Sequence, residues 1–469
     1  MTGGLEPVVV VGGSIAALVA TDRLAADGRS VVLHLPERGV GGGFTALEIG
    51  GRRLDLGARL IELSYDDDAG EPPPLDAYRA GPHGHRPYLV LIDDLVRGLA
   101  GPDLVELDAP QVSVGGRRCS DYVLSGDLSG LVDVLDVDEL SPMAAEAAAR
   151  LEIEGPHGVF EPARAGERWE RDFDDVGRSH TGDAFHDRLI DPLARKVIPG
   201  GSAAVIAGLH RKIWLPLFHP VTAWEACTGQ LSYRPQRAMY SLAGGGMGEV
   251  VLRLIERLTA APEVTIERSG ALRAITGGSG SSVVDLAFED GTAHSATRPI
   301  IGVGSDELFA ATDVDFASTR VVATMVWLDV AAAEIVDLPS VLFATEPELE
   351  LFRVTENQAD SRPGFRTLCC ELDQSCEDPD GWLGAATTSL VALGVLHPGA
   401  VPTQVAGASR PAYAAPSFAN RAAFEQARAQ LDALSLGSIV VGPGSTFGAD
   451  TFNEQVIQGL ASAAARVDG

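Results

Sequence analysis

The chain has 469 residues, of which 45% are hydrophobic and 22% charged, and this length is enough to bury one large core or two smaller ones. The 65 acidic and 36 basic side chains give a formal net charge of −29, a field that repels phosphate backbones and anionic lipids. Nucleic acid and membrane surfaces are therefore excluded as expected partners. Five irregularly spaced cysteines without a C-x-x-C pair predict reduced thiols in a cytoplasmic protein.

The N-terminal segment predicts a β-α-β unit. Val8–Val11 is a short apolar run, which is typical of a strand buried on both faces. After the turn at Gly12–Ser14, the pattern of Ile15–Ala26 indicates a helix, and Ser30–Leu35 indicates a second strand. Parallel pairing of the two strands requires the crossover helix. Because Gly12 and Gly13 interrupt the first apolar run and no basic leader precedes it, we expect neither a signal peptide nor a membrane span.

Further elements follow in chain order. Residues 47–56 predict a hairpin that turns at Gly50-Gly51. Residues from about 70 to 87 predict a surface loop. The stretch from about 76 to 230 predicts an irregular, partly helical region. The remaining predictions are a helix over 245–258, short strands within 264–302, strands within 319–375, a helix over 382–396, a strand over 437–441 and a helix from about 453 to 467.

A strand, a Gly-rich turn, a helix and a second strand are the context in which G-x-G-x-x-G binds a dinucleotide. The first glycine makes a tight turn, and the second lets the backbone approach the pyrophosphate at the N-terminus of the helix. An acidic residue at the end of the second strand holds the ribose hydroxyls.

Together with this opening, several later segments give the chain a resemblance to a known superfamily. The segments are GVGGG (39–43), RLDLGA (53–58), PLARKV (192–197), MYSLAGGGMG (239–248), FRVTE (352–356), CCELD (369–373), PAY (411–413) and VVGPG…NEQVIQGL (440–460). Their order resembles the FAD-dependent superfamily of amine oxidases, protoporphyrinogen oxidases and phytoene desaturases, and within it the proteins related to UDP-galactopyranose mutase.

The resemblance implies an α/β fold with FAD as the only candidate cofactor. A flavin-type (GR2-like) Rossmann domain would comprise residues 1–75, 231–310 and 425–469, and an inserted α+β substrate domain residues 76–230 and 311–424. The cofactor-binding positions that it implies are Gly12, Gly13, Ser14, Ala17, Leu35, Gly41, Gly42, Gly246, Met247, Gly442 and Pro443. For Gly246 and Met247, a plain helix start is the alternative.

Several of these positions depart from the family pattern. Ser14 and Ala17 replace the second and third glycines, and Leu35 replaces the acid that holds the ribose. Neither Gly39 nor Gly43 supplies the arginine that often flanks the paired glycines, and Pro443 replaces a charged residue after Gly442. Four lost contacts at about 1 kcal/mol each add up to about 4 kcal/mol, close to a thousandfold in affinity. The sequence therefore predicts that FAD is absent or weakly bound.

Three residues are candidates for the catalytic or substrate site. Arg353 in FRVTE resembles the mutase arginine that contacts the substrate diphosphate, and an internal salt bridge with Glu356 or Glu371 is the alternative. Tyr413 resembles a position that lines the family's substrate cavity, and His219 in WLPLFHP could act as acid or base. For both, a place in the core is the alternative.

No metal site is predicted. The segment HTGDAFHD (180–187) contains two histidines and two aspartates but lacks a firm ligand spacing, and it is interpreted as a solvated helix start. The active-site lysine of many amine oxidases has no counterpart near residues 321–328, which is evidence against amine oxidation.

Two functions therefore stay open. In the first, the protein keeps the fold without the flavin and acts as a non-redox lyase, isomerase or binding subunit on a small molecule, which Arg353 indicates to be anionic. In the second, it is a working FAD-dependent oxidase, desaturase or mutase-like enzyme. A partner subunit or a homo-oligomer is compatible with both.

Overall fold

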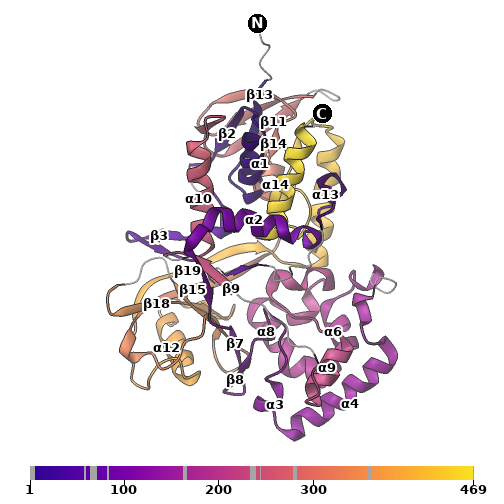
Figure 1. Cartoon of the computed structure of the whole chain (residues 1–469), viewed down its shortest axis with the longest axis vertical. Helices are drawn as coiled ribbons and strands as arrows, with labels where there is room; N and C mark the ends of the chain where they lie inside the picture. The colour runs from indigo at the N-terminus through magenta and orange to yellow at the C-terminus, as the bar shows by residue number, and fades with distance from the viewer. Residues whose placement is uncertain are drawn as a thin grey trace.

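A five-stranded parallel sheet forms the centre of the upper part of the molecule (Figure 1). The computed structural model describes residues 6–37, 39–57, 60–63, 71–81, 84–161, 166–232, 239–242, 244–277, 282–357 and 362–467. The strand order is β10-β2-β1-β14-β20, and every neighbouring pair is parallel. The strands are β1 (Val8–Val11), β2 (Val31–Leu35), β10 (Val264–Arg268), β14 (Ile300–Ile301) and β20 (Ile439–Val440). Segments from the beginning, middle and end of the chain thus share one sheet, as the resemblance predicts.

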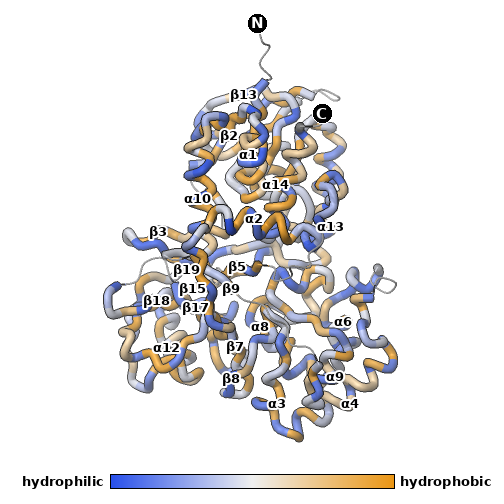
Figure 2. Tube along the Cα trace, viewed as in Figure 1, coloured by the Kyte–Doolittle hydropathy of each residue, from blue (hydrophilic) through white to orange (hydrophobic). Residues whose placement is uncertain are grey.

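Both faces of this sheet are covered, which explains why the four valines of β1 are all buried. On one face, apolar side chains of α1 (Ile15–Ala26), α10 (Met247–Ala260) and α14 (Phe452–Val467) form a common core with the sheet. The elements on the other face are β11 (Leu272–Gly277), β12 (Val283–Phe288), β13 (Ala293–Thr297), α11 (Ser305–Ala311) and α13 (Phe418–Ala433). Hydrophobic stretches run through the interior of this part in Figure 2.

A second, seven-stranded sheet lies at the lower left of Figure 1, with the order β19-β15-β18-β17-β16-β7-β8. Its pairs are antiparallel except for β16 and β7. The strands are β7 (Gln111–Val114), β8 (Arg117–Ser120), β15 (Arg320–Ala331), β16 (Val341–Ala344), β17 (Leu351–Asn357), β18 (Phe365–Leu372) and β19 (Thr403–Ala414), with α12 (Trp382–Ala392) packed beside them.

Helices gather at the lower right of Figure 1 around an apolar core that they share with strands of the seven-stranded sheet. They include α3 (Leu131–Val134), α4 (Val137–Glu154), α6 (Phe173–Thr181), α8 (Asp191–Val197) and α9 (Pro220–Cys227).

Smaller elements lie where the upper and lower parts meet. The hairpin β3 (Leu47–Ile49) and β4 (Arg52–Leu54) and the small sheet β5-β9-β6 are found there, and α2 (Leu89–Ala100) crosses this region in Figure 1. The strands of the small sheet are β5 (Ile61–Glu62), β6 (Leu104–Leu107) and β9 (Met239–Leu242). Ile92 and Val96 of α2 pack into the core under the upper sheet. The boundaries between the two predicted domains at residues 75 and 425 stay a prediction.

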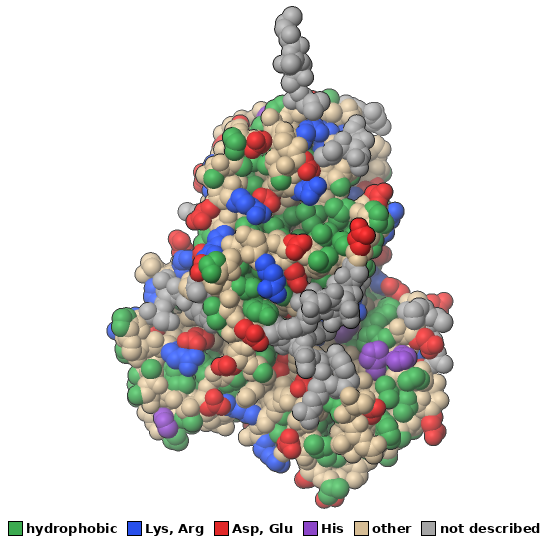
Figure 3. All heavy atoms as spheres, in the orientation of Figure 1, with side chains coloured by type: hydrophobic (Ala, Val, Ile, Leu, Met, Phe, Trp, Pro, Cys, Tyr) green, Lys and Arg blue, Asp and Glu red, His purple; other side chains and the backbone are tan. Residues whose placement is uncertain are grey.

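The first β-α-β unit and the hairpin agree with the predicted positions to within two residues. The helix predicted over 382–396 ends at Ala392. The long edge strand β19 and the separate helices α4 and α13 were not predicted from the sequence. On the face drawn in Figure 3, acidic side chains are spread over both the upper and the lower part. None of the helices in the described ranges combines the length and the apolar character needed to cross a bilayer.

Candidate functional site

The turn between β1 and α1 lies at the carboxyl end of β1, the edge at which open parallel sheets bind ligands. Gly12 has φ +110°, and a Cβ atom at this residue would lie 2.2 Å from the carbonyl oxygen of Gly302. A residue with a side chain would therefore clash with backbone as well as being strained. The tight turn that the sequence predicts is present.

Ser14 caps the N-terminus of α1. Its Oγ accepts a hydrogen bond from the backbone N–H of Ala17 at 3.2 Å. The hydroxyl is close to two other turns, because a Cβ atom on Gly302 would lie 2.7 Å from Ser14 Oγ and one on Gly442 would lie 3.0 Å from it. The serine thus occupies space between three turns, and one of the free N–H groups of the helix end already has a partner.

Leu35 stands at the end of β2, where the ribose-binding acid is expected. Its side chain is 1% exposed and belongs to the apolar core beneath α1. His34 points to the opposite face, where its ring stacks on Phe288 with a centroid distance of 4.6 Å, as strand alternation predicts. Leu35 itself therefore offers a ribose no hydrogen-bond acceptor.

The glycine-rich segment after β2 folds back onto the first turn. The N–H of Gly41 donates to the carbonyl oxygen of Gly13 at 2.6 Å, and a Cβ atom on Gly13 would lie 3.0 Å from Cα of Val40. Gly41 has φ +82° and packs against Val251, whereas a Cβ atom on Gly42 would meet no neighbour within 4 Å. The paired glycines thus shape the backbone around the turn without supplying a charged group.

The C-terminal turn uses its polar groups within the chain. The N–H of Gly442 donates to Oε1 of Gln458 at 2.6 Å. Pro443 has no N–H, and its carbonyl oxygen accepts a hydrogen bond from Oγ of Ser305 at 2.9 Å. Neither residue presents a charged side chain or a free backbone donor at this position.

Gly246 precedes the first residue of α10, and Met247 is 6% exposed in the core beneath the upper sheet. Gly246 also lines a pocket of about 90 Å³ between the upper and lower parts of the molecule. The pocket is further lined by Asp55, Gly57, Ser241, Glu356 and Arg366, among others. Of the predicted cofactor positions, Gly246 thus lies at the junction of the two parts.

Arg353 on β17 is 6% exposed, and its Nε and Nη2 donate to the carboxylate of Glu371 on β18. The salt bridge that the sequence offers as the alternative is present, and its partner is Glu371. A Cβ atom on Gly57 would lie 2.2 Å from Oε1 of Glu371, so the turn at Gly57 lies directly against the ion pair. The third nitrogen, Nη1, is buried without a hydrogen-bond partner among the described residues, and the guanidinium carbon lies 5.4 Å from the centroid of the Trp214 ring.

Tyr413 on β19 is half-buried beside Lys212. Nζ of Lys212 lies 5.6 Å from the centroid of the Tyr413 ring and pairs with Asp450. Burial raises the pKa of Tyr413 and the negative charge of Glu371 adds to this effect, whereas the positive charge of Arg353 lowers the pKa. Lys212, one of only two lysines in the chain, was not predicted at this position.

His219 belongs to a different group of aromatic residues. Its ring lies 4.3 Å from that of Phe160 and 5.4 Å from that of His157, measured between centroids. Burial lowers the pKa of His219, which favours the neutral form. Its described contacts include neither Arg353 nor Tyr413, and the three predicted catalytic residues do not form one site.

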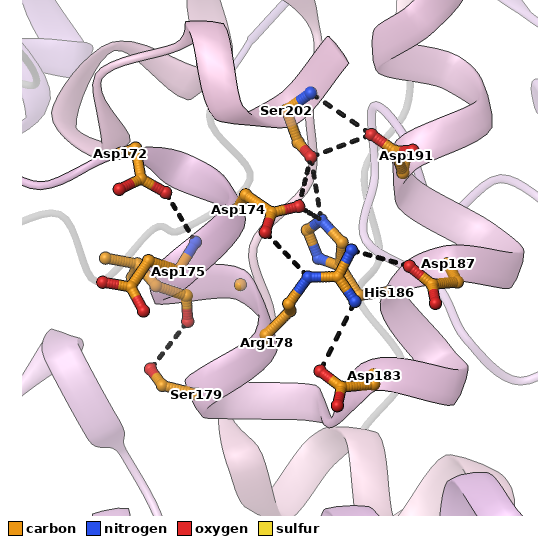
Figure 4. A network of polar contacts seen from close by, with 12 residues as sticks. Asp172, Asp174, Asp175, Arg178, Ser179, Asp183, His186, Asp187, Asp191 and Ser202 are labelled. Atoms are coloured by element: carbon orange, nitrogen blue, oxygen red, sulfur yellow. Dashed lines mark hydrogen bonds and ion pairs between the residues drawn. The ribbon is translucent and has the colours of Figure 1, made fainter. Parts of the chain in front are cut away.

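The segment 180–187 forms part of an ion-pair network that runs from the buried His186 to exposed aspartates (Figure 4). Oγ of Ser202 lies 3.1 Å from Nε2 of His186 and donates to Asp174 at 2.7 Å. His180 and His186 are each 0% exposed, so the predicted solvated helix start is wrong for both histidines, which pack inside the helical core. Arg178 pairs with three aspartates, Asp174, Asp183 and Asp187.

Comparisons of the sequence with family models and with curated proteins found no match. Solved structures match over nearly the whole chain. Reduced UDP-galactopyranose mutase is 15% identical and has a TM-score of 0.71, with 99% of this chain and 94% of that chain covered. A putative protoporphyrinogen oxidase from Exiguobacterium sp. 255-15 is 15% identical, with a TM-score of 0.61 and 99% of each chain covered. Putrescine oxidase bound to putrescine gives the same identity, TM-score and coverage.

These identities are low, and the similarity lies in the course of the backbone. It covers both sheets and the helices between them, including the segments in which the predicted cofactor positions lie. The chain therefore has the fold shared by UDP-galactopyranose mutase, protoporphyrinogen oxidase and putrescine oxidase, as the sequence resemblance predicted.

Proposed function

We propose that this protein has kept the fold of the flavin oxidoreductases without their flavin chemistry and binds or isomerises a small anionic molecule. The observation that carries the proposal is the position of Ser14, whose hydroxyl fills the space between the turns at Gly302 and Gly442 and caps α1. A pyrophosphate needs close approach to this backbone and the free N–H groups at the end of the helix.

Three further positions support the proposal. Leu35 offers no acceptor to a ribose, Pro443 offers neither charge nor donor, and the N–H of Gly442 is already used by Gln458. Because the positions contact different parts of one ligand, their losses add up. At about 1 kcal/mol for each of four contacts, the affinity for FAD would fall by close to a thousandfold.

Arg353 supports an anionic ligand. Its guanidinium is nearly buried, and two of its three nitrogens are satisfied by Glu371. The buried Nη1 still has N–H groups to donate. A phosphate or a carboxylate is the ligand that a guanidinium with such a donor favours.

A working flavoenzyme is the second candidate function. It is favoured by the backbone similarity to reduced UDP-galactopyranose mutase, which covers 94% of that chain, and by the tight turn at Gly12. In that case the remaining backbone contacts would hold FAD, the only candidate cofactor that the resemblance implies.

The visible absorption spectrum of the purified protein distinguishes the two functions. We expect a colourless protein whose titration with FAD causes no change in flavin absorbance or fluorescence. A yellow protein with one flavin per chain would contradict the proposal.

Replacing the departing residues by those of the family pattern tests whether they cause the loss of flavin binding. We expect flavin binding to appear when Ser14→Gly, Leu35→Glu and Pro443→Arg are combined, and circular dichroism will show whether the variant is folded. Because Leu35 is fully buried, the pair Ser14→Gly and Pro443→Arg is tested as well. The matched control is Val32→Glu, which places a glutamate on the same strand but on its opposite face, and it should bind no flavin.

A further inference from the structure

Three possible metal ligands meet at one edge of the parallel sheet. His34 comes from β2, Glu267 from the adjacent strand β10 and His294 from β13, which covers this face of the sheet. One ligand atom from each residue lies within 4.8 Å of the other two. The group is on the face opposite to α1 and is separate from Arg353 and Tyr413.

His34 is the buried member of the group, with an exposure of 2%. Its Nδ1 lies 2.9 Å from Oγ of Ser269 and 3.5 Å from a carboxylate oxygen of Glu267. Its Nε2 is buried and has no hydrogen-bond partner among the described residues. An unsatisfied buried nitrogen costs about 1–3 kcal/mol, so a group that binds it would stabilise the fold.

The other two ligands can be reached from solvent. The side chain of Glu267 is 48% exposed, and that of His294 is half-buried. The rings of His34 and His294 are edge to face, with 5.2 Å between their centroids. An ion could enter from the Glu267 side while Phe288 supports the ring of His34 from within.

We propose that His34, Glu267 and His294 bind a divalent first-row transition-metal ion and that Zn²⁺ fits this site. Two imidazole nitrogens and one carboxylate are ligands that Zn²⁺ accepts, and water would take the fourth position. Ligand atoms around tetrahedral Zn²⁺ lie about 3.3 Å apart, so closing the site needs a small rotation, which the exposed side chain of Glu267 permits.

A hydrogen-bond partner of His34 favours this role. Ser269 can hold one ring nitrogen and thereby aim the other, as hydrogen-bond partners of ligating histidines commonly do. The ion would join three strands at a sheet edge.

The probe is Zn²⁺ alone, added to full-length protein that has been freed of metal with a chelator. Competition with a chromophoric chelator measures stoichiometry and affinity, and Co²⁺ reports a tetrahedral site by its visible absorption. We expect one ion per chain. We expect affinity to fall at least tenfold in His294→Ala and in Glu267→Gln. Two exposed residues elsewhere supply the matched controls, His397→Ala and Glu256→Gln, which should bind as the unaltered protein does.

Thermal unfolding provides a second readout, because an ion bound only by the folded chain raises Tm. Saturating Zn²⁺ should raise the Tm of the unaltered protein and of the two controls and leave that of His294→Ala unchanged. The absence of stoichiometric binding would overturn the proposal. Binding that persists unchanged in His294→Ala and Glu267→Gln would overturn it too, because the ion would then be bound at other histidines of the chain.

Discussion

Arg353 and Glu371 are joined across two neighbouring strands with little access to water, since their side chains are 7% and 13% exposed. Taking two charges out of water costs several kcal/mol, and the bidentate contact offsets that cost. The pair therefore contributes little net stability. Removing one member, however, leaves a buried charge without its partner.

Glu371→Leu should lower the free energy of unfolding by about 3 kcal/mol or more, since it leaves the Arg353 guanidinium unpaired. The double variant Arg353→Met with Glu371→Leu should recover most of this loss. Both are measured by denaturant unfolding. Glu356→Leu is the matched control, because Glu356 pairs with Arg366 across the same strands at 25% and 36% exposure, and it should cost about 1 kcal/mol or less. Equal losses in Glu371→Leu and Glu356→Leu would contradict the argument.

Single residues differ in how far the sequence could predict them. The replacement of a glycine by Ser14 could be predicted because the G-x-G-x-x-G motif has a fixed spacing. Its expected effect, a side chain where the backbone would approach a pyrophosphate, follows from that position. Arg353 and Glu356 lie three residues apart on β17 and therefore point to opposite faces, whereas the pairing of Arg353 with Glu371 depends on the register of β17 and β18, which the sequence leaves open. Lys212 and Asp450 meet only because the chain folds back over 238 residues, and no local pattern indicates that contact.

The helices α1 and α14 pack unusually closely at one point. A Cβ atom on Gly459 of α14 would lie 2.6 Å from the carbonyl oxygen of Ala16 and 2.9 Å from Cβ of Val19, both on α1. This contact sets how near the C-terminal helix lies to the first turn, and therefore the space around Ser14. A glycine in the middle of a helix is otherwise unfavourable by about 1 kcal/mol, so packing explains it here.

Gly459→Ala should destabilise the protein by about 1–3 kcal/mol, because the added methyl group pushes against the backbone of α1. The matched control is Gly98→Ala on α2, where a Cβ atom meets no neighbour within 4 Å. That substitution should stabilise the protein by up to about 1 kcal/mol through helix propensity alone. Thermal unfolding measures both. If both substitutions raised Tm, the close contact between α1 and α14 would be refuted.

At the scale of elements, strong local patterns were predicted and weak ones were not. The four valines of β1 and the period of α1 carry their own signal, and both elements begin and end where the sequence places them. The edge strand β19 is mostly exposed and lacks an alternating apolar pattern, so its only signal is pairing with β15. No local pattern indicates the proposed metal-ligand group either, since its three residues come from three strands.

At the scale of the whole molecule, one buried lysine contributes to the contact between the two halves of the lower part. Lys196 at the end of α8 is 3% exposed, and its Nζ donates to the carbonyl oxygens of Leu349 and Leu351 at 2.6 and 2.7 Å. The backbone N–H of Gln374 donates to the carbonyl oxygen of Lys196 at 3.0 Å. These contacts attach the helical region to the seven-stranded sheet, on the side of the sheet that holds Arg353.

Burial lowers the pKa of Lys196 from 10.5 to about 8, although Asp373 and Glu346 oppose the shift. Between these two pH values the unfolded chain binds more protons than the folded chain, so the contribution of Lys196 to stability rises with pH. Relative to Lys196→Met, the unaltered protein should therefore gain up to about 3 kcal/mol of unfolding free energy from pH 8 to pH 10.5. The control Arg195→Met removes a neighbouring charge that does not titrate in this range, and its difference from the unaltered protein should stay constant. If the difference in unfolding free energy between the unaltered protein and Lys196→Met also stayed constant with pH, the lysine would keep its ordinary pKa. The buried position of Lys196 at the end of α8 would then be refuted.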